Sequence, residues 1–418
     1  MSGRASDNGH HPQPSSPEEP SMIQRRTFVR LLGSGMVTAA GAGSLALWSL
    51  SPEFPAEAVE IWRGPGSEPD VRRRAIAYAA TAPNPHNRQP WMVDLRTPDT
   101  ITLYCDVERL LPQTDPFGRQ ILIGHGAFLE LMVMALAEQN VRAEVTLWPE
   151  GELPRTLAQW SRRPIARLRL MPGAQPDPLF AQVLSRHTPK MRFDITRPVT
   201  EQTLQQVVAA GAAVDVTSRG TVDMALVQPL RELCLDAARV ELLTPATVME
   251  SLRLMRVGPD EILQDRDGIS INSRAARVFS ALGQFDRSRP PAADSPAFKQ
   301  ALQMFDDYSS TAMGFVWLAT ARNGRTDQVQ AGRAYVRQQL QATALGLGVH
   351  PMSQALQEFP EMAVPYAAAH RSLLDVAAPR GAEDPTLQMM CRIGYPVASV
   401  QATPRRPLVQ FIIGGAAA

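Results

Sequence analysis

A stretch punctuated by prolines constrains the fold of this chain most. Residues 82–91 read Ala-Pro-Asn-Pro-His-Asn-Arg-Gln-Pro-Trp. Proline fixes φ and has no N–H group, so the alanine-rich helix expected at 72–80 must end here and the chain must turn. The turn presents polar side chains beside one large aromatic residue, which suits a flat heteroaromatic ligand. Purely structural turns of this composition are more common, and the loop alone does not decide between the two uses.

The composition is that of an ordinary folded protein. The chain has 418 residues, 44% of them hydrophobic and 20% charged, which is enough for two domains or one fused double domain. A net charge of +1 gives no broad basic field, so nucleic acid is not an expected partner. Cys105, Cys234 and Cys391 have no metal-ligand spacing and are too few for a disulfide framework, so we expect buried thiols and no metal site.

The first 58 residues predict an export signal. Residues 1–22 are rich in Ser, Pro, Gly and His, a composition typical of disorder. Within residues 23–58, Arg25 and Arg26 precede a weakly hydrophobic run at 31–50 and then Ala-Glu-Ala ending at Ala58, a pattern typical of a twin-arginine signal. A single membrane-spanning helix is the alternative, because the run approaches the ~20 residues that cross a bilayer.

The signal predicts an exported, periplasmic protein with the twin-arginine translocase as a transient partner. Cleavage after Ala58 and retention as a membrane anchor both stay open. Because this route moves folded proteins, a non-covalent cofactor must bind before export.

The periodicity of the remaining chain predicts an α+β fold. The strands and helices expected on this basis are a hairpin at 92–95 and 101–105, a buried helix at 121–140, strands at 141–148 and 165–170, a helix at 201–210, a strand at 314–321, a helix at 328–346 and a strand at 388–395. A Pro-rich break at 172–178 separates two halves. The weak similarity between the stretches that begin at Gly126 and Gly332 fits an internal duplication.

A second polar stretch opens the later half. Arg186, Thr188 and Lys190 alternate with other residues in a turn-like segment. Two cations and a hydroxyl on one side of an extended chain match the oxygens of a phosphate group. A solvated basic strand is the more common reading of such a pattern.

These motifs resemble the FMN-dependent nitroreductase superfamily, in particular its Acg-like branch of fused, single-chain members. The stretch 82–91 is similar to the Ala-Pro-Ser-x-His-Asn-x-Gln-Pro-Trp loop of that family, and 186–190 to its Arg-x-Ser/Thr-x-Arg phosphate motif, with lysine where arginine is frequent. The Asp-Pro-x-Gly-Arg turn at 115–119, the loop at 346–354, the Arg-Ile-Gly-Tyr strand at 392–395 and the Pro-Arg-Arg-Pro segment at 404–407 also resemble this branch.

The resemblance implies a nitroreductase-like fold made of two fused halves, 59–178 and 179–418, in an intramolecular pseudo-dimer with mixed or antiparallel sheets and central helices. The loop at 82–91 occurs once, in the first half, and the phosphate motif at 186–190 occurs once, in the second half. Together they imply a single FMN between the halves. The implied FMN-binding residues are Asn84, His86, Asn87, Gln89, Trp91, Arg186, Thr188, Lys190, Pro351, Met352, Ser353 and Arg405 or Arg406. The flavin carries the chemistry, and no protein residue is assigned as catalytic.

The implied activity is that of an exported, monomeric FMN-dependent oxidoreductase. It would pass electrons in a ping-pong exchange from an unidentified donor to a small-molecule acceptor, quinone-like or nitroaromatic. A flavin-binding or flavin-sequestering protein with little turnover is the alternative, and a third reading keeps the fold without the cofactor. The segment 253–291 is either a lid over the site or a surface insertion.

Overall fold

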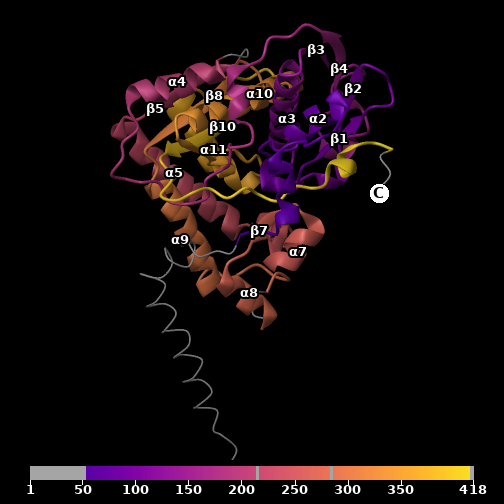
Figure 1. The fold of residues 1–418 in the computed structure, drawn as a ribbon. Coiled ribbons are helices and arrows are strands. Elements are labelled where there is room, and N and C mark those ends of the chain that lie inside the picture. Colours follow the sequence, from indigo (N-terminus) through magenta and orange to yellow (C-terminus); the bar gives the residue numbers. More distant parts are fainter. Residues whose placement is uncertain (1–52, 213–215, 283–285, 415–418) are drawn as a thin grey trace, which may run out of the picture. The chain divides into compact units, whose positions relative to one another are not determined.

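The computed structural model describes residues 53–212, 216–282 and 286–414. The described residues exclude the segment predicted to be disordered and most of the predicted signal, including Arg25, Arg26 and the apolar run. The described residues form one compact unit with two four-stranded sheets (Figure 1). Every pair of neighbouring strands in these two sheets is antiparallel.

The first half begins with helix α2 (Val71–Ala79), which Asp70 caps by accepting the backbone N–H of Arg72. The elements that follow are β1 (Trp91–Asp94), β2 (Thr100–Cys105), α3 (Arg119–Ala137), β3 (Val141–Leu147) and β4 (Pro164–Pro172). They form a sheet of order β1-β2-β4-β3. Along β3 the burial alternates residue by residue, as the period of a strand with one face packed requires.

The second half repeats this topology. Its elements are α4 (Glu201–Gly211), β5 (Thr217–Thr221), β8 (Gly314–Thr320), α10 (Arg325–Ala344), β9 (Gly348–Pro351) and β10 (Thr386–Gly394). Their sheet order, β5-β8-β10-β9, is that of the first half element for element. The α+β prediction with two fused halves and central helices is therefore confirmed.

Helices α3 and α10 pack against each other at the centre of the molecule (Figure 1). By length and composition α3 is apolar enough to cross a membrane, but most of it is buried inside the body, as a core helix is. Its first residue, Arg119, donates to the carbonyls of Leu356 and Gln388 in the second half. The first residue of α10, Arg325, donates to the carbonyls of Leu153 and Pro154 in the first half. Equivalent arginines thus tie each central helix to the opposite half.

A long insertion separates β5 from β8. It contains α5 (Met224–Leu243), α6 (Pro245–Arg253), β6 (Met255–Val257), α7 (Gly258–Asp265), β7 (Ile269–Ile271), α8 (Arg274–Ala281) and α9 (Pro296–Ser310). A further helix, α11 (Ala363–Leu374), lies between β9 and β10. The segment 253–291 thus includes β6, α7, β7 and α8, and its two short strands pair in parallel. Weak periodicity in the sequence did not reveal these short elements.

The chain returns to the first half after β10. The C-terminal segment runs from the second sheet toward the first (Figure 1), where Ile412 forms a parallel bridge to Val93 of β1. The three cysteines are free and buried, as predicted. The return carries residues 403–406 past the loop at 84–91, so pieces more than 300 residues apart meet there.

Candidate functional site

The ring loop, residues 84–91, has an unusual backbone. His86, Asn87 and Gln89 have φ values of 47°, 50° and 49°, in the left-handed region that non-glycine residues rarely adopt. Asn84 stabilises the turn by accepting the backbone N–H of Gln89 at 2.7 Å on its Oδ1. Three such residues among four carry strain, which persists only where outside contacts fix the backbone.

Side-chain amides supply some of those contacts. Asn87 donates from Nδ2 to the Pro404 carbonyl at 2.9 Å and accepts from Arg405 Nη1 at 2.9 Å. Gln89, fully buried, donates to the Arg266 carbonyl at 2.9 Å and accepts the Arg406 N–H at 2.8 Å. These two amides hold the loop to the C-terminal segment and to the insertion, so their hydrogen bonds in this structure are made to other parts of the protein.

Among the described residues, His86 and Trp91 are the two loop residues with a buried polar side-chain atom that has no hydrogen-bond partner. These atoms are Nδ1 of His86 and Nε1 of Trp91, and only His86 is partly exposed. Desolvation, and then the charges of Lys190 and Arg88, lower the pKa of His86 to about 4. The imidazole is therefore neutral at pH 7 and can still donate or accept one hydrogen bond to a ligand.

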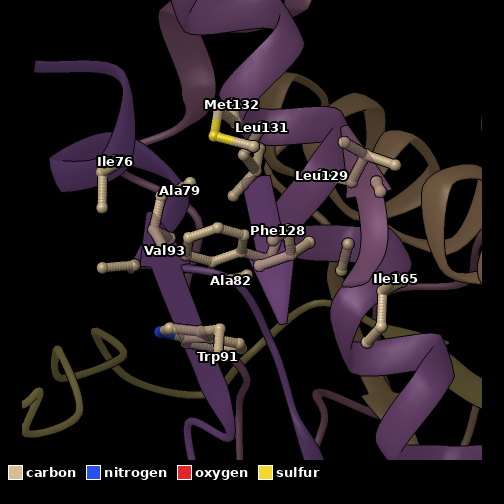
Figure 2. Close-up of a cluster of buried hydrophobic side chains, with 14 of the residues drawn as sticks. Ile76, Ala79, Ala82, Trp91, Val93, Phe128, Leu129, Leu131, Met132 and Ile165 are labelled. Carbon is tan, nitrogen blue, oxygen red and sulfur yellow. The ribbon is translucent and has the colours of Figure 1, made fainter. Parts of the chain in front are cut away.

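Trp91 lies in the core of the first half. Its indole is fully buried and stacks on Phe128, with ring centroids 4.7 Å apart and planes inclined by 26° (Figure 2). Val93 and Ile165 are members of the same hydrophobic cluster. We expected this tryptophan to contact a bound ring, but the structure places it in the core, where it anchors the end of the ring loop.

Two buried guanidinium groups converge behind the loop. Arg186 and Arg405 both donate from Nη2 to the Thr81 carbonyl just after α2, at 2.8 and 3.1 Å. Desolvation lowers the pKa of Arg186 to about 10, and desolvation with the charge of Arg186 lowers that of Arg405 to about 9. The Nε of Arg186 is buried without a hydrogen-bond partner among the described residues.

Lys190 extends the same positive cluster. The surrounding protein lowers its pKa by desolvation, and the charge of Arg405 lowers it further. Yet the residue keeps solvent-exposed surface. Its charge also lowers the pKa values of His86, in the ring loop, and of His350, in β9.

Trp62 covers this cluster, although no sequence motif pointed to it. The residue belongs to the short helix η2 (Glu60–Arg63), and its Nε1 donates to the Thr403 carbonyl at 2.8 Å. The guanidinium carbons of Arg405 and Arg186 lie 5.1 and 5.6 Å from the centre of its ring, within cation–π range. The only sequence signal was a lone tryptophan between the predicted export signal and the first helix.

Arg392 supports the backbone of residues 189–191, next to Arg186 in the sequence. This buried arginine of β10 donates from Nη2 to the carbonyls of Pro189 and Met191, and from Nε to His350 Nδ1 at 3.0 Å. Burial lowers its pKa to about 9. The Arg-Ile-Gly-Tyr strand marked this residue in the sequence, but its support of 189–191 became visible only in the structure.

The other predicted residues have separate positions. Arg406 donates to the Gln89 carbonyl and to Gln410, so Arg405, rather than Arg406, joins Arg186 and Lys190.

Met352 is buried in the core of the second half, and Pro351 pairs with Cys391 in the β9–β10 ladder. The Ser353 carbonyl accepts from Gln120 at 3.4 Å. Thr188 is half-buried between Arg186 and Lys190 in sequence.

The cluster fits a phosphate group. In the part of the chain that the structure describes, Arg186, Lys190 and Arg405 form no ion pair with a carboxylate. Unpaired charges in a desolvated site are costly, and an anion would offset that cost. The partnerless Nε of Arg186 adds a donor to a set that matches phosphate oxygens.

Comparisons with known proteins are consistent with these motifs. No family model matches the chain. Two proteins of Mycobacterium tuberculosis (strain ATCC 25618 / H37Rv), named "Putative NAD(P)H nitroreductase" acg and Rv3131, are 26% and 25% identical to it. The alignments cover 81% of this chain in both cases, and 94% and 90% of the two relatives. The chain is similar to proteins named as putative nitroreductases.

Solved structures with a similar fold cover about half of this chain. The FMN-dependent nitroreductase NfnB of Mycobacterium smegmatis, in complex with NADPH, is 20% identical and covers 54% of this chain and 92% of its own, with a TM-score of 0.33. A nitroreductase of Bacteroides fragilis with bound FMN is 12% identical and covers 55% of this chain and 95% of its own, with a TM-score of 0.32.

Proposed function

We propose that the chain is an exported FMN-dependent oxidoreductase of nitroreductase type. The observation that carries the proposal is the cluster of Arg186, Lys190 and Arg405, three cations without a carboxylate partner among the described residues. Relatives named as NAD(P)H nitroreductases, aligned over most of both chains, support the same class. We further propose that one FMN binds between the two halves, with its phosphate on this cluster.

The protein's residues would bind and orient the cofactor. Arg186, Thr188, Lys190 and Arg405 would hold the phosphate, and Arg392 keeps the segment 189–191 in place. His86 is neutral at pH 7, so it would offer a hydrogen bond without adding charge beside the ring. FMN, when bound, supplies the electron transfer, and the surrounding hydrogen bonds tune its potential.

The electron donor and acceptor are proposals of class only. The acceptor would be a small quinone-like or nitroaromatic molecule, reached by a ping-pong exchange. The sequence has no glycine-rich fingerprint for a bound dinucleotide. Nicotinamide cofactors are scarce outside the cytoplasm, so an exported form of this chain would require a different reductant.

One observation favours the alternative, a protein that binds flavin with little turnover. Residues of the insertion bond directly to the ring loop, since Gln89 donates to the Arg266 carbonyl and Gly268 donates to the Asn87 carbonyl. A segment fixed in this way restricts access to the loop. The two functions differ in whether a small acceptor can reoxidise the reduced flavin.

An anaerobic absorbance experiment tests the proposal. Protein purified from the periplasm or membrane would be recorded as isolated, after dithionite, and after menadione in the dark. Flavin bands that bleach and recover support the oxidoreductase. Bands that bleach but do not recover support sequestration, and protein that neither contains nor binds FMN contradicts both.

A further inference from the structure

One buried carboxylate joins the ring loop to the insertion. Asp267, 4% exposed, accepts from Arg88 Nη1 at 3.0 Å and from Arg109 Nη1 at 2.8 Å on its Oδ2. Its Oδ1 accepts from Arg256 Nη2 at 2.8 Å. The three arginines come from the ring loop, from η4 (Val107–Arg109) after β2, and from β6. A single side chain therefore connects three segments that are distant in sequence.

The neighbours of Asp267 bond to the neighbours of Arg88. Gly268 donates its N–H to the Asn87 carbonyl at 3.3 Å, and Arg266 accepts on its carbonyl from Gln89 Nε2 at 2.9 Å. Three consecutive residues of the insertion thus meet three consecutive residues of the loop. Gly268 has a φ of 71°, and a Cβ there would lie 2.2 Å from the Leu254 carbonyl oxygen, so this approach requires glycine.

Arg88 depends on Asp267 for its charge partner. Arg109 also pairs with Asp106 at 3.3 Å, and Arg256 also pairs with Asp265 at 2.8 Å. Within the described ranges, Asp267 is the only carboxylate that pairs with Arg88. Burial lowers the pKa of Arg88, and Asp267 counteracts this effect. Removal of Asp267 would leave a desolvated guanidinium in a loop that already holds three left-handed residues.

We propose that Asp267 is a positioning residue that fixes the ring loop, and that residues 266–268 act as a permanent brace rather than a moving lid. The bond between the brace and the loop does not depend on the ligand. The consequence for flavin binding rests on the proposed function.

The test compares Asp267→Asn with Asp265→Asn. The control removes a carboxylate from the same Arg256 but touches neither Arg88 nor Arg109. Amide hydrogen exchange is followed in flavin-free protein at Asn87, Arg88 and Gln89, whose N–H groups bond within the loop. Asp267→Asn should speed exchange there about tenfold or more, and Asp265→Asn should leave it unchanged, because only the first unties the loop.

A second readout addresses the ligand. Asp267→Asn should weaken FMN binding about tenfold and shift the midpoint potential of bound flavin, with both quantities unchanged in Asp265→Asn. If Asp267→Asn speeds loop exchange but the wild-type protein does not bind FMN, the brace is supported and the proposed function is refuted. Wild-type exchange in Asp267→Asn would overturn the brace. Should Asp267→Asn fail to fold, Arg88→Gln must speed loop exchange in the same way, or the proposal fails.

A separate observation concerns the predicted cleavage site. Ala58 is fully buried, and its carbonyl accepts the N–H of Arg405 at 2.8 Å. The carbonyl of Glu57 accepts from Arg266 Nη1 at 2.9 Å, and that of Glu53 from Asn272 Nδ2 at 2.9 Å. Residues 53–58 are therefore part of the folded body and contact both the phosphate cluster and the insertion.

We infer that export leaves the chain uncleaved after Ala58, so the preceding apolar run is retained as an anchor. Twin-arginine export carries folded protein, and a peptidase cannot reach a buried peptide bond without local unfolding. Intact mass and N-terminal sequencing of the exported protein should find residues upstream of 59, with the protein in the membrane fraction. A mature terminus at Val59 would overturn the inference. Loss of export in an Arg25→Lys, Arg26→Lys variant checks the route independently.

Discussion

Gly126 of α3 and Gly332 of α10 face each other where the two central helices cross. A Cβ on Gly126 would lie 2.0 Å from the Val329 carbonyl oxygen, and one on Gly332 would lie 1.9 Å from the Ile123 carbonyl oxygen. Each glycine is the eighth residue of its helix, so the contact relates equivalent positions of the two halves. Backbone contacts backbone at this point, and there is no room for a side chain.

Replacing Gly126 with alanine should destabilise the protein strongly. Alanine is worth up to about 1 kcal/mol more than glycine inside a helix, but the clash with backbone atoms cannot be relieved by a rotamer change. We expect a net loss of about 2 kcal/mol or more in the free energy of unfolding, measured by urea denaturation. Gly381→Ala is the control, because its Cβ would meet nothing closer than 4.0 Å. Equal stability of the two variants would show that the helices separate at little cost.

Replacing Arg186 with glutamine should weaken flavin binding. Hydrogen bonds between a charged group and its partner are worth about 1.5–3 kcal/mol, which corresponds to roughly 10- to 100-fold in affinity. Equilibrium titration of flavin-free protein with FMN measures this change. Arg337→Gln is the matched control, since that arginine already pairs with Glu130 and Asp177. Similar losses in the two variants would argue against a phosphate on the cluster.

Trp62 should support the cluster through its ring face. In Trp62→Phe the aromatic face remains but the bond to the Thr403 carbonyl is lost, whereas Trp62→Ala removes both. Because cation–π contacts contribute about 0.5–2 kcal/mol, FMN affinity should fall in the order wild type, Phe, Ala. Affinities of the two variants that agree within error would assign Trp62 to packing alone.

Glu241 should make the stability of the protein depend on pH. Burial raises the pKa of this carboxyl to about 7 from its usual 4.5, although hydrogen bonds to Gln357 and Gln354 oppose the shift. Between these two values the folded state holds a proton that the unfolded state has released, so stability falls as pH rises. The full penalty, about 3 kcal/mol, is present above pH 7.

The variant Glu241→Gln cannot ionise at this position and should lose this part of the pH dependence. Its free energy of unfolding should match that of the wild type near pH 4 and exceed it at pH 8. Asp115, whose pKa burial raises to about 6, contributes in the same direction in both proteins. If the free energy of unfolding depends on pH in the same way in both proteins, Glu241 is ruled out as the source.

Local patterns predicted most of the secondary structure of the two halves. The central helix expected at 121–140 is α3 (Arg119–Ala137), and the one expected at 328–346 is α10 (Arg325–Ala344). The first segment is long and strongly apolar, and in the second Val336, Leu340 and Ala344 recur at helical spacing. The helices and strands of the insertion, including the long helices α5 and α9, were not predicted, and part of the insertion is held by contacts with distant segments such as the ring loop.

The polar motifs were located in the sequence, but their roles were not. An arginine pair at 405–406 reads as one motif, yet the two side chains enter different clusters. Trp91 stands beside polar loop residues and nevertheless packs on Phe128. Side-chain direction depends on the turn of the backbone, which local spacing does not encode.

The sequence by itself determined the α+β class, the two halves, the buried thiols and the resemblance to nitroreductases, since each depends on periodicity, residue type or short motifs. Only the tertiary structure decided that Arg405 joins Arg186, that Trp62 covers them, and that Asp267 holds the ring loop. These contacts join residues more than a hundred positions apart, and such pairs form only when the burial of both halves brings their segments together.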